Sequence, residues 1–219
     1  RLNRPGKHLV YNSLAAVCLA QEQYTRAEPL FARAVAIWEV TLGPEHPFLA
    51  NGLSNMAVLQ KRQGHYAQAQ PLYERALSIR ERALGPDHPL VATSLNNLAL
   101  LHNDQGRYAE AEPLFARALA IDEKALGSNH PDLAVDLHNL AECFRAQSKY
   151  TQAEPLFARA VMIWEVSRPD HPNVVGSLNG LARTRQALGM TAQARQDFDQ
   201  AIAILRRRSS DGSATLARV

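Results

Sequence analysis

The sequence predicts an all-α protein, a solenoid of five helix-turn-helix repeats with about ten antiparallel helices. The first observation is a period, because the dipeptide His-Pro recurs with spacings of 42, 42 and 41 residues. The second is a repeated octapeptide, AEPLFARA, at residues 27–34, 111–118 and 153–160. The third is the helical spacing of apolar residues inside each copy. A period of this length is typical of stacked repeats.

Each copy contains two segments with the pattern of an amphipathic helix, as the third copy shows. From Pro89 onward leucines recur at helical spacing, and Gly106 ends this first helix. From Tyr108 onward alanines and Phe115 share one stripe, and Gly127 ends the second helix. The proline of each Glu-Pro or Gln-Pro pair lies close to the start of the second helix, where a missing N–H is tolerated.

The His-Pro pairs lie in the links between copies, in segments such as LGPDHP at residues 84–89. The glycine supplies the backbone conformation that ends a helix, and the proline starts the next helix. We expect the Asp, Glu or Asn before the histidine to accept hydrogen bonds from the first amides, and the histidine to pack over the turn. A metal site is the alternative, but one histidine per repeat, with repeats about 10 Å apart, does not converge on one ion. No metal or cofactor is predicted.

The repeats have boundaries that follow from this period. Together they form one array, residues 1–208, and residues 209–219 are expected to be a flexible C-terminal tail. The five copies are expected at residues 5–46, 47–88, 89–130, 131–171 and 172–208.

The outer copies differ from the inner ones. The fourth lacks the glycine of the link, so we expect an altered connection near Ser167–Arg168. In the fifth, Asp197 and Asp199 add polarity to the last helix, which suggests a cap with a wettable outer face. The first copy keeps the inner pattern, so we expect further repeats or another domain before Arg1.

Composition excludes several classes of partner. The net charge of +3 resides in residues 206–219, so the rest of the chain has no basic face for nucleic acid. No apolar run approaches the roughly 18 residues of a membrane span. The two cysteines, Cys18 and Cys143, fall in different repeats, which makes a disulfide improbable. We therefore predict a cytoplasmic protein that binds neither nucleic acid nor membrane.

Catalytic signatures are absent from the sequence. There is no phosphate-binding loop, HExxH, CxxC or nucleophile-elbow pattern. Both cysteines lie on apolar helix faces and are interpreted as core residues. The sequence therefore predicts that the chain is not an enzyme.

A small alanine in LNNLALL, followed by GRYAEAEPLFARAL, resembles the tetratricopeptide repeat (TPR). The period of 42 residues and the LGPDHP link resemble the repeats of kinesin light chains and of many bacterial repeat proteins. This resemblance implies a right-handed superhelix whose concave face is lined by the first helix of each repeat. It also implies a role in binding a peptide or protein.

By this resemblance, asparagines form two adjacent columns on the concave face. A carboxamide both donates and accepts, so such a ladder suits the backbone of an extended peptide. The alternative, which stays open, is that these amides bond the neighbouring repeat and hold the stack together. The columns contain Asn55, Asn97 and Asn139, and Asn12, Asn96 and Asn179.

The other predicted groove residues give the face a basic character with apolar pockets. This suits an acidic peptide with a bulky side chain, and the alternative is a solvated charged face. Asp104 and Glu142 partly offset the positive charge. The residues are Lys61, Arg62, Arg145 and Arg183, the pocket residues Val58 and Leu100, and the neighbouring Asn103 and His138.

A column of the second helices holds Trp38, Arg80, Asp122 and Trp164. Because it accepts Arg and Asp, we expect it to be partly exposed rather than deep in the core.

These observations predict a non-catalytic scaffold or adaptor that binds an extended, acidic peptide segment of a partner. The alternative is a regulatory or sensory arm of a larger signalling enzyme whose catalytic domain lies upstream. Self-association through the N-terminal repeat is a third hypothesis.

Overall fold

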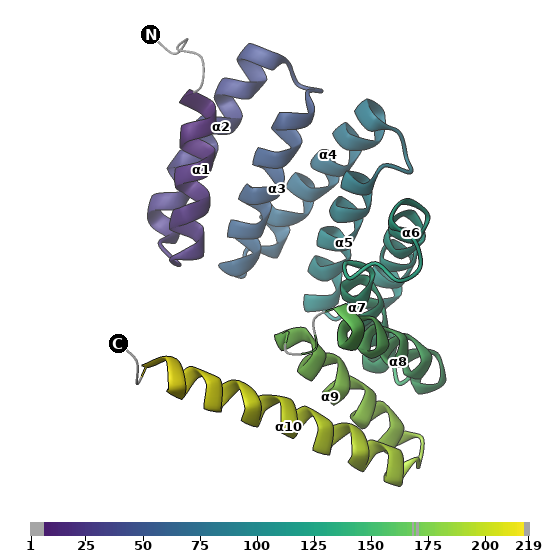
Figure 1. Ribbon diagram of the computed structural model, residues 1–219. Helices are drawn as coiled ribbons and strands as arrows, with labels where there is room; N and C mark the ends of the chain where they lie inside the picture. The colour runs from purple at the N-terminus through teal and green to yellow at the C-terminus, as the bar shows by residue number, and fades with distance from the viewer. Residues whose placement is uncertain (1–6, 168, 170, 217–219) are drawn as a thin grey trace. The chain divides into compact units, whose positions relative to one another are not determined.

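A computed structural model describes residues 7–167, 169 and 171–216. Within these residues the regular structure is entirely α-helical, in ten helices (Figure 1). Arg168, in the link expected to be altered, lies outside the described residues. The helices are α1 (Lys7–Ala20), α2 (Tyr24–Leu42), α3 (Pro47–Arg62), α4 (Tyr66–Leu84), α5 (Pro89–Asp104), α6 (Tyr108–Leu126), α7 (Leu133–Ala146), α8 (Tyr150–Ser167), α9 (Pro172–Ala187) and α10 (Thr191–Leu216).

The chain divides into two compact units, Arg1–Arg107 with α1 to α5 and Tyr108–Val219 with α6 to α10. In the first unit α1 packs on α2, α2 on α3, α3 on α4 and α4 on α5. In the second unit α6 to α10 pack on one another in the same sequential order. The predicted all-α fold of helix-turn-helix repeats is confirmed. One continuous array over residues 1–208 stays a prediction. Because α10 continues to Leu216, the predicted start of a flexible tail at residue 209 is too early.

The core repeats with the sequence. Every first helix buries an alanine completely, and the second helices of repeats one to four bury an aromatic residue against it. Small side chains on one helix allow the backbone of the other to approach, so the aromatic ring fills the remaining space. These residues are Ala15, Ala57, Ala99, Ala141 and Ala182, and Phe31, Tyr73, Phe115 and Phe157.

The histidines of the links cap the helices that follow them. Gly85 ends α4 with a φ of 87°, and the Nδ1 atom of His88 then accepts a hydrogen bond from the Leu90 amide at 3.1 Å. His46 and His171 bond the amides two residues ahead in the same way, at 3.2 Å. The interpretation that the preceding acid caps the helix is therefore corrected. The histidine occupies the N-cap position, from which a side chain reaches the second amide.

We expect His88→Ala to lower the free energy of unfolding by about 1 kcal/mol, because the Leu90 amide loses its acceptor. His88→Asn keeps an acceptor at the same position and should remain close to the wild type. Urea unfolding followed by circular dichroism measures both. An alanine variant as stable as the wild type would show that the cap contributes nothing.

The last repeat departs from the predicted cap at Asp197. This side chain is buried, and both of its carboxylate oxygens accept from Nη1 of Arg185, at 2.9 and 3.0 Å. Arg185 also pairs with Glu154 at 2.9 Å, so the three residues tie α8, α9 and α10 together. Asp197 is therefore an internal contact of the second unit rather than part of a wettable outer face.

Candidate functional site

A pocket of about 210 Å³ lies in the second unit, between α7, α8 and α9. It brings together two residues that the sequence predicted, His138 and Asn139, on the first helix of the fourth repeat. The residues from α8 and α9 were not predicted, since their contribution depends on how neighbouring hairpins pack. The lining is Val135, His138 and Asn139 from α7, Trp164 from α8, and Pro172, Asn173 and Gly176 from α9.

His138 is the most enclosed polar side chain of the pocket. Its Nδ1 atom lies 3.1 Å from Oγ of Ser177 on α9, and its ring meets Phe157 edge to face with centroids 5.5 Å apart. Burial lowers the pKa of His138, Glu142 opposes this shift, and Arg145 adds to it. The imidazole is therefore neutral at pH 7, and a neutral ring has one donor and one acceptor nitrogen. It can orient a polar group of a ligand without requiring a charge.

Trp164 forms a flat apolar wall of the pocket. Its ring stacks on His171 with centroids 4.8 Å apart and an angle of 3° between the planes. Only 3% of Trp164 is exposed, as are 2% of Trp38 and 4% of Arg80. The expectation that this column is partly exposed is therefore wrong. It lies between repeats, and each member has its own neighbours there.

A stripe of polar residues continues from the pocket along α9. Asn179 and Arg183 are exposed and follow Gly176 by three and seven residues, which places them on the same helix face. On α7, Arg145 pairs with Glu142 at 2.5 Å, and this contact raises the pKa of Arg145. Among the basic groove residues predicted in this unit, Arg183 is thus the more exposed cation.

In the first unit one amide contact supports the stacking role. Nδ2 of Asn55 on α3 donates to Oδ1 of Asn12 on α1 at 3.2 Å. Lys61 on α3 pairs with Asp104 on α5 at 2.9 Å, and Arg62 is exposed. Together with Arg145, this means that two of the four predicted cations are paired with the acids that flank them. The basic character of the face is weaker than the sequence suggests.

The remaining predicted residues lie half-buried on first helices, so part of each side chain is accessible. Val58 packs against the core cluster of α1 and α2. Oδ1 of Asn103 is buried and has no hydrogen-bond partner within the described residues. The half-buried set is Val58, Asn96, Asn97, Leu100 and Asn103.

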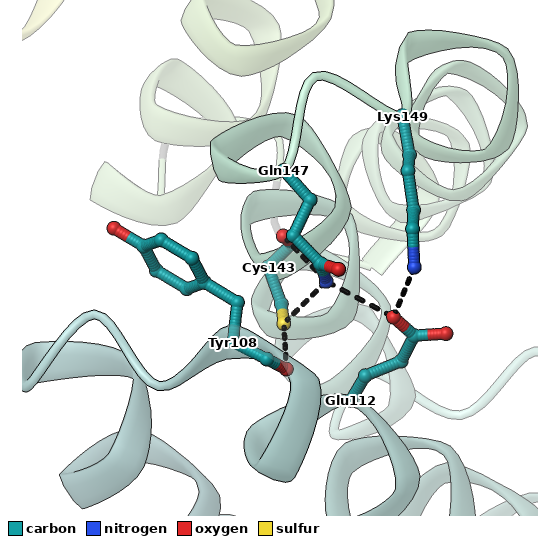
Figure 2. Close-up of polar contacts among 5 residues, drawn as sticks. All are labelled: Tyr108, Glu112, Cys143, Gln147 and Lys149. Atoms are coloured by element: carbon teal, nitrogen blue, oxygen red, sulfur yellow. Dashed lines mark hydrogen bonds and ion pairs between the residues drawn. The ribbon is translucent and has the colours of Figure 1, made fainter.

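A polar cluster that the sequence did not predict joins α6 to the end of α7 (Figure 2). A carboxylate oxygen of Glu112 accepts from Nζ of Lys149 at 2.6 Å and from Nε2 of Gln147 at 3.0 Å. The Lys149 bond lowers the pKa of Glu112. Cys143 lies beside them with Sγ 3.6 Å from the Tyr108 carbonyl oxygen, and burial raises the pKa of its thiol. A buried protonated thiol has the properties of a core residue and not of a nucleophile.

Comparison with known families agrees with this geometry. The family model described as the tetratricopeptide repeat matches residues 8–82, 53–124, 90–164 and 137–207, which together cover most of the chain. The chain belongs to the tetratricopeptide-repeat family. No curated protein matches it.

Solved structures similar to this TPR protein include a kinesin light chain protein of Podosopora anserina with nearly identical TPR-like repeats. It is 28% identical, covers 94% of this chain and 98% of its own, and has a TM-score of 0.79. BtubC from P. vanneervenii is 24% identical, with 92% and 80% covered and a TM-score of 0.81. Aspartyl phosphate phosphatase F from Bacillus subtilis is 18% identical, with 93% and 51% covered and a TM-score of 0.77. The last two show likeness of fold.

Two classes of site were sought in the described part of the TPR protein. No three His, Cys, Asp or Glu residues there are grouped so that they could hold a metal ion. In the same residues, no helix combines the length and apolarity that crossing a membrane requires.

Proposed function

We propose that this TPR protein is a non-catalytic adaptor that binds an extended segment of a partner protein. TPR repeats generally mediate protein–protein interaction. The pocket between α7, α8 and α9 carries the proposal, because its volume of about 210 Å³ suits one bulky side chain. Val135, Trp164 and Pro172 supply apolar surface, and His138 and Asn139 supply polar atoms that orient the ligand.

The α9 stripe supports binding of the flanking peptide. Asn179 can bond a peptide backbone, since its carboxamide both donates and accepts. Arg183 is exposed one turn further and favours a carboxylate in the ligand. A segment with a bulky apolar residue followed or preceded by an acidic one is the ligand that this surface suits. A regulatory arm of a larger enzyme would use the same surface, and this alternative stays a prediction.

Gly176→Leu tests the proposal because it fills the pocket without disturbing the fold. A Cβ atom at Gly176 would meet only the His138 ring, at 3.8 Å, which is ordinary contact. Replacing a helical glycine is expected to leave stability unchanged or raise it by about 0.5–1 kcal/mol. Peptides selected from a displayed random library on the wild type should bind the leucine variant at least about tenfold more weakly.

Gly176→Ala is the matched control, because it makes the same helix change and leaves most of the pocket open. We expect it to bind the selected peptides within about twofold of the wild type, since tenfold corresponds to about 1.4 kcal/mol. Dissociation constants from fluorescence anisotropy and melting curves measure the two effects separately. Selected peptides that bind the leucine variant as tightly as the wild type would place the ligand elsewhere.

A further inference from the structure

Helix α1 exposes a row of large apolar side chains. Val10, Leu14 and Val17 are 64%, 45% and 52% exposed, and their spacing puts them on one face of the helix. The corresponding positions are covered in the next repeat of the same unit. Gly52 and Leu59, each 42 residues further on, are buried, and Leu59 belongs to a core cluster with Phe31 of α2.

The second unit repeats this arrangement. Positions 84 residues beyond Leu14 in the third repeat, and those 42 residues further again, hold buried residues. Cys143, the counterpart of Val17 in the fourth repeat, is within 3.6 Å of the Tyr108 carbonyl oxygen on the preceding second helix. The internal interfaces therefore show what covers this face: a helix that lies where the second helix of a preceding repeat would lie.

An ion pair accompanies each of two such interfaces. Arg75 on α4 pairs with Glu39 on α2 at 2.7 Å, and Arg159 on α8 pairs with Glu123 on α6 at 2.6 Å. Arg33 stands 42 residues before Arg75, and its guanidinium lies over the Tyr11 ring of α1 at 5.0 Å. Arg33 therefore lies at the position where a docked helix would present a carboxylate.

A second copy of this chain has the apolar surface but the wrong charge. Ile202 and Leu205 of α10 are 45% and 49% exposed, and they follow Val161 and Trp164 of α8 by 41 residues. Arg206, however, stands 41 residues after Glu165, at the position that holds glutamate in the preceding repeats. Head-to-tail contact of two copies would place Arg206 against Arg33, and like charges there oppose association.

The α1 face also sets a size limit. Gly52 stands at the position of Val10 in the next repeat, and a Cβ atom there would lie 2.5 Å from the Trp38 ring. Val10 occupies the space that Gly52 leaves to Trp38. A helix docked on α1 must therefore carry a side chain smaller than tryptophan at the Trp38 position.

We propose that the α1 face formed by Val10, Leu14 and Val17 binds an amphipathic helix of a partner protein. The helix carries an apolar stripe, a small side chain at the Trp38 position, and a glutamate directly after it that pairs with Arg33. This surface is separate from the pocket between α7, α8 and α9, so its failure would leave the peptide-binding function untouched.

The probe is a stapled, fluorescently labelled helical peptide with the sequence of residues 150–167 and the change Trp164→Ala. It supplies the apolar stripe, the small residue and Glu165. We expect it to bind the full chain, and the same peptide with Glu165→Arg to bind at least about tenfold more weakly. Arg33→Glu in the protein should reverse this preference. Two peptides that bind alike, or a preference that Arg33→Glu leaves unchanged, would overturn the proposal.

Two variants of the chain complete the test. Val17→Asp changes an exposed side chain, so it should abolish peptide binding while the melting temperature remains near the wild type. Arg206→Glu gives α10 the required glutamate after Leu205, and it should convert a monomer into concentration-dependent oligomers, measured by light scattering. Wild-type chains that associate until Val17→Asp separates them would show that the occupant is a second copy and not a partner. An Arg206→Glu chain that stays monomeric would remove the role of this charge.

Discussion

Replacing Arg80 by tryptophan is expected to cost about 3 kcal/mol of unfolding free energy, and adding Ser94→Gly is expected to recover at least half of it. The buried Arg80 guanidinium donates to Oδ1 of Asn51 at 2.7 Å, to Oγ of Ser94 at 2.5 Å and to the Leu90 carbonyl at 3.3 Å. A tryptophan alone loses these bonds and meets the Ser94 side chain. It leaves buried polar atoms without partners, which is a large penalty.

The first repeat shows why the second change should help. Trp38 occupies the same column as Arg80, and it packs where Gly52 has no side chain. Ser94 stands 42 residues after Gly52, so Arg80→Trp with Ser94→Gly recreates a pair that this protein already contains. The two changes should therefore be coupled by about 1–3 kcal/mol in a double-mutant cycle.

Urea unfolding of the wild type, both single variants and the double variant measures this coupling. Ser94→Gly alone serves as the control for the helix cost of glycine, about 1 kcal/mol. If the two single effects simply add, the column residues do not recognise one another across the repeat interface, and the explanation of their burial fails.

The second large effect is a pH dependence of opposite sign at two carboxyl groups of α6. Asp122 faces the buried Asp136 of α7. Burial raises the pKa of Asp122 and the Asp132 charge adds to this, whereas the Asp136 contact and His130 act in the opposite direction. A folded state that holds the proton more tightly than the unfolded chain is favoured at low pH. The contribution of Asp122 is complete below about pH 3.9 and is lost as the pH rises through its raised pKa.

Glu112 behaves in the opposite way. Its bond to Lys149 lowers its pKa, so its stabilisation is present above about pH 4.3 and is lost as the pH falls through the lowered value. The side chain is partly exposed, and solvent screening limits this pair to about 0.2–1 kcal/mol.

Asp122→Asn should therefore raise stability at pH 7 by about 1 kcal/mol, since the amide donates to Asp136 without a second charge. Glu112→Gln should lower stability at pH 7 and have little effect near pH 3. Urea unfolding of the three chains across this pH range gives the comparison, and Asp199→Asn on the exposed face of α10 is the neutral control. Two variants that change stability in the same direction at pH 7 would contradict the assignment.

The sequence alone predicts the helices, because their signals are local and recur with the period. Gly85, Gly127 and the His-Pro pairs appear at the helix boundaries where they are expected. The role of the histidine was not predicted, because capping depends on which residue takes the N-cap conformation. His88 has a ψ of 140° there, and this turns its Nδ1 atom toward the Leu90 amide.

The site was predicted in part for the same reason. His138 and Asn139 follow from the columns of the first helices, and both line the pocket. Trp164 was expected to be partly exposed, and the contribution of Gly176 was not foreseen, because these residues meet only across a repeat interface. The Asn12–Asn55 bond likewise resolves, for that pair, a choice between two roles that composition leaves equal.

The sequence by itself determined that the protein is a stack of helical hairpins of about 42 residues, and where each helix ends. Periodicity and backbone preference suffice for this, because each copy repeats the same local instructions. Only the tertiary structure decided which residues face one another between copies: Trp38 over Gly52, Arg80 with Ser94, and Asp122 with Asp136. The period is common to all copies, whereas the partner of each buried side chain depends on the packing of two particular helices.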